Sequence, residues 1–323
     1  MLIRVFELQN GFWEVKCIFL PISLIVENTA GQRSSVVRYM LIAALSYSIV
    51  GLSVHALGEN SWTIALFARA LFGLPFAWYG AKGIPITKDQ LFEKSLLLRS
   101  ALAVSFIAFF YYSLQIIRPG DAFALVSMRP LWVAGIYVLL KRSKTKLIFW
   151  LLSIVGVFGV VLMEGSRLSG SHQFILIACA IGVLGAGSTI TIDLCKSHSD
   201  RLMTLHYTGL MFLVSLVFLF LTGSNLGLID WLDPKTFLLF VLMGSAGNLY
   251  TLFSIKAVKK AGAEVGSSIV LLTTVFAYVA GHLIWRDGFS LIGTVGIILT
   301  LMPCISIVGF GNLLGKNTFL SNS

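Results

Sequence analysis

The chain has 323 residues, of which 57% are hydrophobic and only 12% are charged, and its formal net charge is +10. Water-soluble domains contain about 45–50% apolar and about 25% charged residues, so this composition excludes a water-soluble enzyme. The sequence contains no low-complexity tract and no Gly-X-Y period, which excludes a disordered or collagen-like chain. The positive charge is expected in loops on one side of a bilayer, and no nucleic-acid partner is expected.

The cysteines are too dispersed to build a disulfide framework or a metal site. None of the four belongs to a CxxC motif or to a Cys/His pair at ligand spacing, so they are interpreted as small apolar residues. A GxxxxGK[ST] phosphate-binding loop is also missing from the sequence, so this chain is not expected to use ATP. No cofactor and no metal are expected.

Residues 1–35 precede the first long apolar run. Within them Cys17–Val26 is apolar, but it has only ten residues and contains Pro21, which is too short to span a membrane. Glu7 and Glu14 precede this segment and no small-residue cleavage pattern follows it, so it does not match a signal peptide. We expect residues 1–35 to form a loose or interfacial cytoplasmic extension. The alternative is that they follow an upstream start that the working protein does not need.

Ten apolar runs follow, each long enough to cross about 30 Å of hydrocarbon as a helix with a rise of about 1.5 Å per residue. They are Val36–Val54, Trp62–Ala81, Leu96–Ile116, Ala122–Leu140, Leu147–Met163, Phe174–Leu194, Leu202–Thr222, Thr236–Ile255, Val265–Trp285 and Phe289–Phe310. The runs are too long and too uniform for barrel strands. The sequence therefore predicts an all-α integral membrane protein with ten transmembrane helices.

The loops between these runs alternate in charge. One set, which includes Lys82–Ser95 and is counted with flanking residues such as Arg99, holds sixteen Lys and Arg, whereas the other set holds four. Basic loops face the cytoplasm. Both termini are therefore expected in the cytoplasm, and the membrane is expected to be a bacterial inner (plasma) membrane.

Hydropathy and turn spacing divide the chain into two five-helix repeats, residues 36–163 and 174–310, followed by a cytoplasmic tail, residues 311–323. Gly156 and Gly296 correspond at an offset of 140 residues in the last helix of each repeat. Because five is an odd number, tandem repeats of this size enter the membrane from opposite sides. Inverted repeats are typical of transporters, whose substrate site lies near the midplane between the repeats.

Three segments resemble the EamA family of the drug/metabolite transporter superfamily. They are ALFARALFGLPFAW (Ala65–Trp78), YYSLQIIRPGDAFALVSMRPLW (Tyr111–Trp132) and SIKAVKKAGAEVGSSIVLLTTVFAYVAGHLIW (Ser254–Trp285), within a resemblance that covers Val36 to Phe310. The resemblance implies a small-molecule carrier whose first, third, fourth, sixth, eighth and ninth helices surround a central cavity.

Two positions match the family pattern, namely Arg69 in the second helix and Pro130 in the fourth, and the resemblance implies a gating or structural role for them. Three positions depart from it. Lys141-Arg142 and Arg286-Asp287 replace a Gly-Glu pair after the fourth and ninth helices, and Thr273 replaces a proline.

Arg129 is the main candidate for substrate binding. It lies about 12 Å into the fourth helix, where a charged side chain is costly and usually faces a cavity. Its planar guanidinium can hold a carboxylate or phosphate with two hydrogen bonds. The alternatives are an internal carboxylate or helix-end carbonyl as partner, or a side chain that reaches back to the interface. We expect further cavity residues at Trp132, Tyr47, Asn248, Tyr250, Tyr111, Tyr112, Thr273 and Thr274.

Several of these residues have a simpler interpretation. Tyr111 and Tyr112 lie where an interfacial aromatic belt is expected. Thr273 and Thr274 can return their hydrogen bonds to the helix backbone. Asn248 cannot do this easily, so it is expected to find a partner on another helix.

The sequence therefore predicts a secondary transporter for a small polar metabolite, such as an amino acid, a nucleoside-like molecule or an amine, that works by alternating access. A channel-like or receptor-like protein is the alternative, and a membrane-embedded enzyme is the least favoured because no catalytic constellation is present. The expected partners are the lipid bilayer and a small-molecule substrate, with a homodimer as an open alternative.

Overall fold

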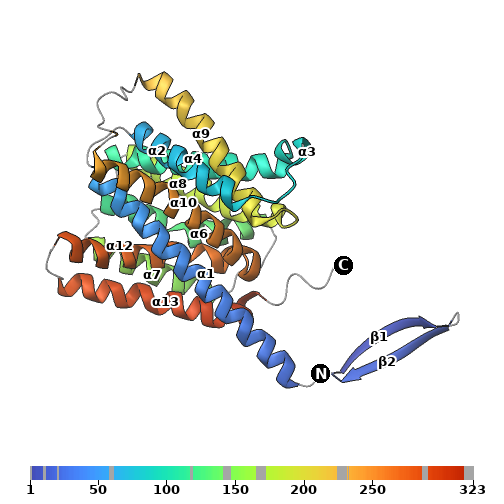
Figure 1. Cartoon of the computed structure of the whole chain (residues 1–323). Helices are drawn as coiled ribbons and strands as arrows, with labels where there is room; N and C mark the ends of the chain where they lie inside the picture. The colour runs from blue at the N-terminus through green and yellow to red at the C-terminus, as the bar shows by residue number, and fades with distance from the viewer. Residues whose placement is uncertain are drawn as a thin grey trace.

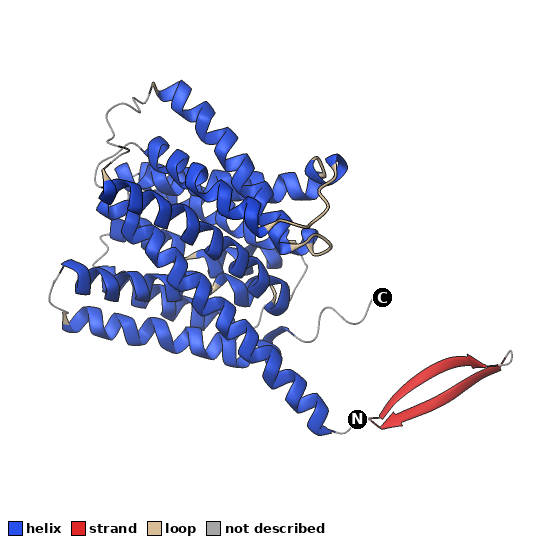
Figure 2. Cartoon of the chain, viewed as in Figure 1, coloured by secondary structure: helices blue, strands red, loops and turns tan. Residues whose placement is uncertain are grey.

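The computed structural model describes residues 2–9, 12–19, 22–57, 62–116, 119–140, 147–164, 172–223, 231, 233–285 and 290–315. Figure 1 shows a bundle of helices and a two-stranded sheet that lies apart from it, and Figure 2 separates the two kinds of element by colour. The elements are β1 (Leu2–Gln9), β2 (Phe12–Phe19), α1 (Ile22–Ala56), α2 (Trp62–Gly80), α3 (Lys88–Leu91), α4 (Lys94–Ile116), α5 (Pro119–Ser127), α6 (Arg129–Leu139), α7 (Leu147–Glu164), α8 (His172–Ile190), the 3₁₀ helix η1 (Thr191–Cys195), α9 (Asp200–Thr222), α10 (Pro234–Ala261), α11 (Ala263–Ser267), α12 (Ile269–Trp285) and α13 (Leu291–Gly315).

The N-terminal segment forms two strands and the beginning of α1. Strands β1 and β2 pair antiparallel in a register that sets Leu2 opposite Phe19 and Gln9 opposite Phe12, and α1 begins at Ile22, well before Val36. The loose or interfacial cytoplasmic extension expected over residues 1–35 remains a prediction. The two residues between the strands are Asn10 and Gly11, a dipeptide that favours two-residue hairpin connections, and this signal was available in the sequence.

Within the described residues, eight helical segments have the length and apolar composition needed to cross a membrane. They are α1, α2, α4, α5 with α6, α8 with η1, α9, α10, and α11 with α12. Two shorter apolar helices, Leu147–Met163 and Leu291–Ile307, occupy the places of the fifth and tenth predicted runs. The structure thus supports a multi-pass helical membrane protein, while ten complete spans remain a prediction.

The outward faces of the helices carry large apolar side chains that water would not favour. Leu139, Phe220 and Leu291 are 81%, 88% and 82% exposed, respectively. Many large exposed apolar side chains of this kind indicate contact with another apolar phase. These faces are suited to lipid acyl chains.

Two predicted helices are interrupted at matching places. The fourth run divides at Met128 into α5 and α6, and the ninth divides at Ser268 into α11 and α12, which lies 140 residues further along. At each break the backbone makes two hydrogen bonds in which a residue donates to the carbonyl three positions before it. One example at each break is Met128 N–H to Leu125 C=O and Ser268 N–H to Val265 C=O. This tighter turn is the 3₁₀ pattern.

The first break has a clear cause in the sequence, whereas the second does not. Pro130 occupies the first turn of α6, where its missing N–H is tolerated, whereas the interior of one continuous helix would lose a backbone hydrogen bond at this residue. No proline stands at the second break. The short helices also pack reciprocally, since α5 contacts α12 and α11 contacts α6.

Helices α7 and α13 lie side by side along one flank of the bundle (Figure 1). Their backbones touch at Gly159 and Gly296, where a Cβ atom on Gly159 would lie 2.7 Å from the Gly296 carbonyl oxygen and one on Gly296 would lie 2.6 Å from the Gly159 carbonyl oxygen. Only glycine permits this approach at both positions. The Thr300 hydroxyl lies across the contact and donates to the Gly296 carbonyl.

Candidate functional site

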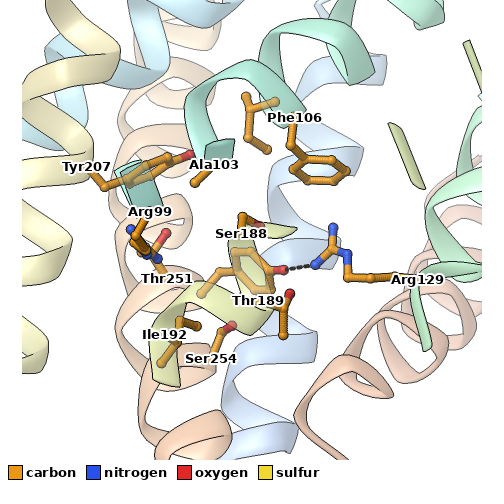
Figure 3. Close-up of a pocket in the computed structure, with 12 residues that line it drawn as sticks. Arg99, Ala103, Phe106, Arg129, Ser188, Thr189, Ile192, Tyr207, Thr251 and Ser254 are labelled. Atoms are coloured by element: carbon orange, nitrogen blue, oxygen red, sulfur yellow. Dashed lines mark hydrogen bonds between the residues drawn. The ribbon is translucent and has the colours of Figure 1, made fainter. Parts of the chain in front are cut away.

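A small cavity lies among five of the helical segments in the interior of the bundle (Figure 3). Its volume is about 40 Å³. The side chains that line it come from α4, α6, α8 with η1, α9 and α10, and they are Arg99, Ala103, Phe106, Ile107, Arg129, Ser188, Thr189, Ile192, Tyr207, Tyr250, Thr251 and Ser254. Both halves of the chain therefore contribute to one cavity.

Helical spacing explains why these residues face together. On α4, Arg99, Ala103, Phe106 and Ile107 are separated by four, three and one residues, which puts them on one face of a helix. The lining residues of α10, from Tyr250 to Ser254, span a single turn. On both α4 and α10 the lining residues thus share one face of the helix.

Arg129 begins α6 and is only 6% exposed. Its Nη1 donates a 3.0 Å hydrogen bond to the Tyr250 hydroxyl, and its guanidinium carbon lies 4.3 Å from the centroid of the Phe106 ring. Its Nε and Nη2 atoms have no hydrogen-bond partner among the described residues. A Cβ atom on Gly185 would lie 3.1 Å from Arg129 Nε, so the glycine leaves room for the guanidinium.

Arg99 is a second buried arginine at the same cavity. It is 5% exposed, and its guanidinium carbon lies 5.4 Å from the centroid of the Tyr207 ring. Its Nε and Nη1 atoms also have no hydrogen-bond partner among the described residues. Figure 3 shows Arg99 and Arg129 on opposite sides of the cavity.

The electrostatics of this site are dominated by positive charge. Among the described residues, no ion pair involves Arg99 or Arg129, and no carboxylate lines the cavity. On insertion scales a centrally placed arginine costs about 2.5–3.5 kcal/mol in a membrane helix, and cation–π contacts return roughly 0.5–2 kcal/mol. The site is therefore suited to an anion that completes the hydrogen bonding of the two guanidinium groups.

Tyr250 connects the cavity to α1. Its ring stacks on that of Tyr47 with centroids 4.3 Å apart, and Tyr47 is 2% exposed. The Tyr47 hydroxyl has no hydrogen-bond partner among the described residues. Tyr47 thus lies behind Tyr250 and supports it without lining the cavity itself.

Arg69 forms a separate buried group with Tyr111. Arg69 is 1% exposed, and its Nη1 donates a 3.3 Å hydrogen bond to the Tyr111 hydroxyl. A Cβ atom on Gly247 would lie 2.8 Å from Arg69 Nε, so α10 approaches this side chain closely. These contacts fit the structural role that the family resemblance implies for Arg69, and neither residue lines the cavity.

The remaining predicted residues lie outside the cavity lining. Trp132 occupies the space beside Gly182 on α8. Tyr112 is 42% exposed and packs edge-on against Trp62. Asn248 bonds to the Thr208 hydroxyl and to the Gly73 carbonyl, which confirms that it finds partners across helices.

Thr273 and Thr274 follow their simpler interpretation, because their hydroxyls donate to the Ile269 and Val270 carbonyls. The Thr274 hydroxyl also lies 2.9 Å from that of Ser127, next to the break between α5 and α6. Pro130 is buried at the start of α6, directly after Arg129. The structure thus brings Arg129 and Tyr250 into the cavity and leaves the other predicted residues around it.

Sequence reasoning overlooked several lining residues, of which Arg99 is the most important. It was counted with the basic loops because it lies only three residues inside the run Leu96–Ile116. The available signal was its spacing to Phe106 and Ile107 on one face of α4. Tyr207 and the hydroxyl residues of α8 carry no comparable signal.

A cluster of polar residues connects three of the cavity-lining helices at the ends where the basic loops join them. The His198 Nε2 atom lies 2.8 Å from a carboxylate oxygen of Glu93, which precedes α4. The Lys259 ammonium lies 2.7 Å from the Asp200 carboxylate and donates to the His198 carbonyl at 2.6 Å. The connection before α4, the start of α9 and the end of α10 are therefore held together at this end.

The apolar helices and their exposed apolar faces define the chain as a multi-pass α-helical membrane protein. Residues 173–309 match the profile of the EamA-like transporter family. The matched family is part of the drug/metabolite transporter superfamily, and its members are transporters. The resemblance predicted over Val36 to Phe310 is thereby confirmed for the second repeat.

Solved structures agree on the fold, with 29 chains that match this one. One of them, titled only "Crystal structure of protein", has a TM-score of 0.68 and 13% sequence identity, and the match covers 87% of this chain and 99% of that chain. At this identity the likeness concerns the fold alone. No curated protein matches the chain.

Proposed function

We propose that the chain is a secondary transporter that moves a small polar metabolite across a bacterial inner membrane by alternating access. The observation that carries this proposal is the cavity, which residues from both halves of the chain enclose and into which Arg129 projects. An anionic group of the substrate binds Arg129, with Tyr250 as the neighbouring hydroxyl. Candidate substrates are amino acids, nucleoside-like metabolites and amines that carry such a group.

The interrupted helices support this mechanism. Transporters with inverted repeats commonly place their site at discontinuous helices, and here α6 begins at Arg129 while a matching break separates α11 from α12. We infer that residues 36–163 and 174–310 are the two inverted five-helix repeats. The sixteen-to-four asymmetry of basic residues supports an orientation with both termini in the cytoplasm.

The size of the cavity supports a closed conformation. Pockets for metabolite-sized ligands have volumes of about 300–1,000 Å³, so a cavity of about 40 Å³ must enlarge before a whole substrate enters. The cluster of Glu93, His198, Asp200 and Lys259 holds one end of the lining helices together. Opening on that side requires these contacts to separate.

Counterflow in proteoliposomes tests the proposal. Vesicles that contain the purified protein are loaded with an unlabelled metabolite mixture, and uptake of labelled candidate metabolites is measured. A transporter gives saturable uptake that is accelerated by internal substrate. Unsaturable flux indicates a channel, and binding without flux indicates a receptor; either result contradicts the proposal.

A further inference from the structure

We propose that the cavity binds a compact dianion, either a phosphate monoester group or a pair of carboxylates, which Arg99 and Arg129 hold from two sides. This inference rests on the proposed transport function and narrows its substrate class. It depends on Arg99, which the sequence places among the basic loops and the structure places at the cavity.

The first argument is the number of unused donors. Both guanidinium groups are at least nine-tenths buried, and each has two nitrogen atoms without a hydrogen-bond partner among the described residues. Buried donors without partners are costly, and native proteins rarely leave them so. Two guanidinium forks together match the oxygen atoms of a phosphate or of two carboxylates.

The second argument concerns the other polar groups in the lining. The hydroxyls of Ser188, Thr189 and Thr251 donate to backbone carbonyls of their own helices, so their protons are already engaged. The Tyr250 hydroxyl accepts from Arg129, which leaves its own proton for a ligand. The donors at the cavity thus include the two arginines and Tyr250, and none of its lining residues is a carboxylate, a combination that favours an anion over a cation.

The third argument is charge balance. Two buried arginines that line one cavity repel each other, and this repulsion is stronger where the dielectric constant is lower. A monoanion would neutralise only one of them, whereas a dianion neutralises both. A simple amine without an anionic group would add a third positive charge and is disfavoured.

Matched pairs of small anions test this inference on the full-length purified protein. The pairs are methyl phosphate with dimethyl phosphate, and succinate with its monoamide succinamate, which differ in charge but little in size. At about pH 7.5 a phosphate monoester is mostly a dianion. Thermal unfolding measured over a range of concentrations gives the apparent Kd of each probe, because a ligand of the folded state raises Tm.

We expect the dianion of at least one pair to bind about 10- to 100-fold more tightly than its monoanion counterpart. The pair that responds distinguishes a phosphate site from a dicarboxylate site. Equal binding within both pairs, or no binding of either dianion, overturns the inference with the wild-type protein alone.

Variants then assign the preference to Arg99. Arg99→Gln should reduce the ratio within the responsive pair to about twofold or less and leave monoanion binding at Arg129. Arg201→Gln, which removes an exposed charge at the start of α9, is the matched control and should keep the ratio. A preference that survives in a folded Arg99→Gln protein overturns the role of Arg99.

The two proposals can fail separately. If a dianion binds but does not move in counterflow, the transport proposal fails and the binding site remains. If a zwitterion or monoanion is transported and no dianion is preferred, the dianion inference fails and the transporter remains.

Discussion

Arg129 Nη1 donates a 3.0 Å hydrogen bond to the Tyr250 hydroxyl, and this bond joins two residues that are 121 positions apart in the chain. One residue begins α6 in the first half, and the other lies in α10 in the second half. Because Tyr250 also stacks on Tyr47 of α1, a movement of α10 away from α6 would separate the phenol from the guanidinium or carry α1 along. The geometry of the cavity thus depends on how the two halves are placed.

Arg129→Lys should weaken substrate binding while the protein still folds. The lysine keeps the positive charge but loses the fork that holds an anion with two hydrogen bonds. Charge-assisted hydrogen bonds contribute about 1.5–3 kcal/mol, so we expect the apparent KM in liposome uptake to rise about 10- to 100-fold. Arg201→Lys, at an exposed position, serves as the control. An unchanged KM in Arg129→Lys would show that the arginine has a structural role only.

Two substitutions at Tyr250 should separate its hydroxyl from its ring. Tyr250→Phe keeps the stacking on Tyr47 and should raise the apparent KM with little change in Tm. Tyr250→Ala also removes the ring and should lower the free energy of unfolding by about 3–5 kcal/mol, as large-to-small changes in a packed interior do. The measurements are uptake kinetics and thermal unfolding. Equal KM values for Tyr250→Phe and wild type would place the hydroxyl outside the binding site.

Gly159→Ala should destabilise the protein because its new methyl group would meet the Gly296 carbonyl and the Thr300 hydroxyl. Overpacking of this kind costs roughly 1–3 kcal/mol. Gly80→Ala is the control, because a Cβ atom there meets nothing within 4 Å and alanine favours the helix by up to about 1 kcal/mol. Unfolding in mild detergent should therefore show opposite changes in the two variants. Similar stability of both would mean that α7 and α13 can separate at little cost.

Acid should weaken the contact between Glu93 and His198. Hydrogen bonds from Ser95 and from His198 lower the pKa of the Glu93 carboxyl below its ordinary value of 4.5. A carboxyl whose pKa is lowered by folding stabilises the folded state above its unfolded-state pKa, and this contribution is lost as the pH falls through the folded-state pKa. Glu93→Gln should therefore lower Tm at about pH 6, and the difference from wild type should shrink below about pH 4.5. A difference that persists in acid would assign the effect to packing.

The ends of α9 should be accessible from opposite sides of the membrane. Ser197 precedes this helix on the side of the basic loops, Thr222 is its last residue, and both are exposed. In a variant whose four native cysteines are replaced by alanine, Thr222→Cys should react with a membrane-impermeant maleimide in intact cells. Ser197→Cys should react only after the cells are opened. Labelling of both in intact cells would contradict the proposed orientation.

The helices could be predicted from the sequence because a bilayer requires long apolar runs, and this requirement leaves a strong signal. Pro130 likewise indicates the break between α5 and α6 in the sequence, because proline always lacks the backbone N–H donor that a helix interior needs. The break at Ser268 is not predicted from the sequence, because no proline stands there as Pro130 does at the first break.

The site was only partly predictable. Arg129 was identified because a charge in the middle of an apolar run is rare, whereas Arg99 lies near a run's end, where basic residues are common. Trp132 was assigned to the cavity from its depth and its spacing to Arg129, but Gly182 offers its indole a place on α8. Depth and helical spacing do not specify which neighbour a side chain meets.

The reciprocal contact between Gly159 and Gly296 also limits how the transporter can move. If α7 slid along α13 by one residue, about 1.5 Å, a residue with a side chain would take the place of Gly159 against Gly296. The two backbones are too close there for any residue except glycine. These two helices therefore have a single allowed register and are expected to move as one unit. Neither helix contributes a residue to the cavity lining. We therefore expect the rearrangement that admits a substrate to take place among α4, α6, α8, α9 and α10, with α7 and α13 moving only as a pair.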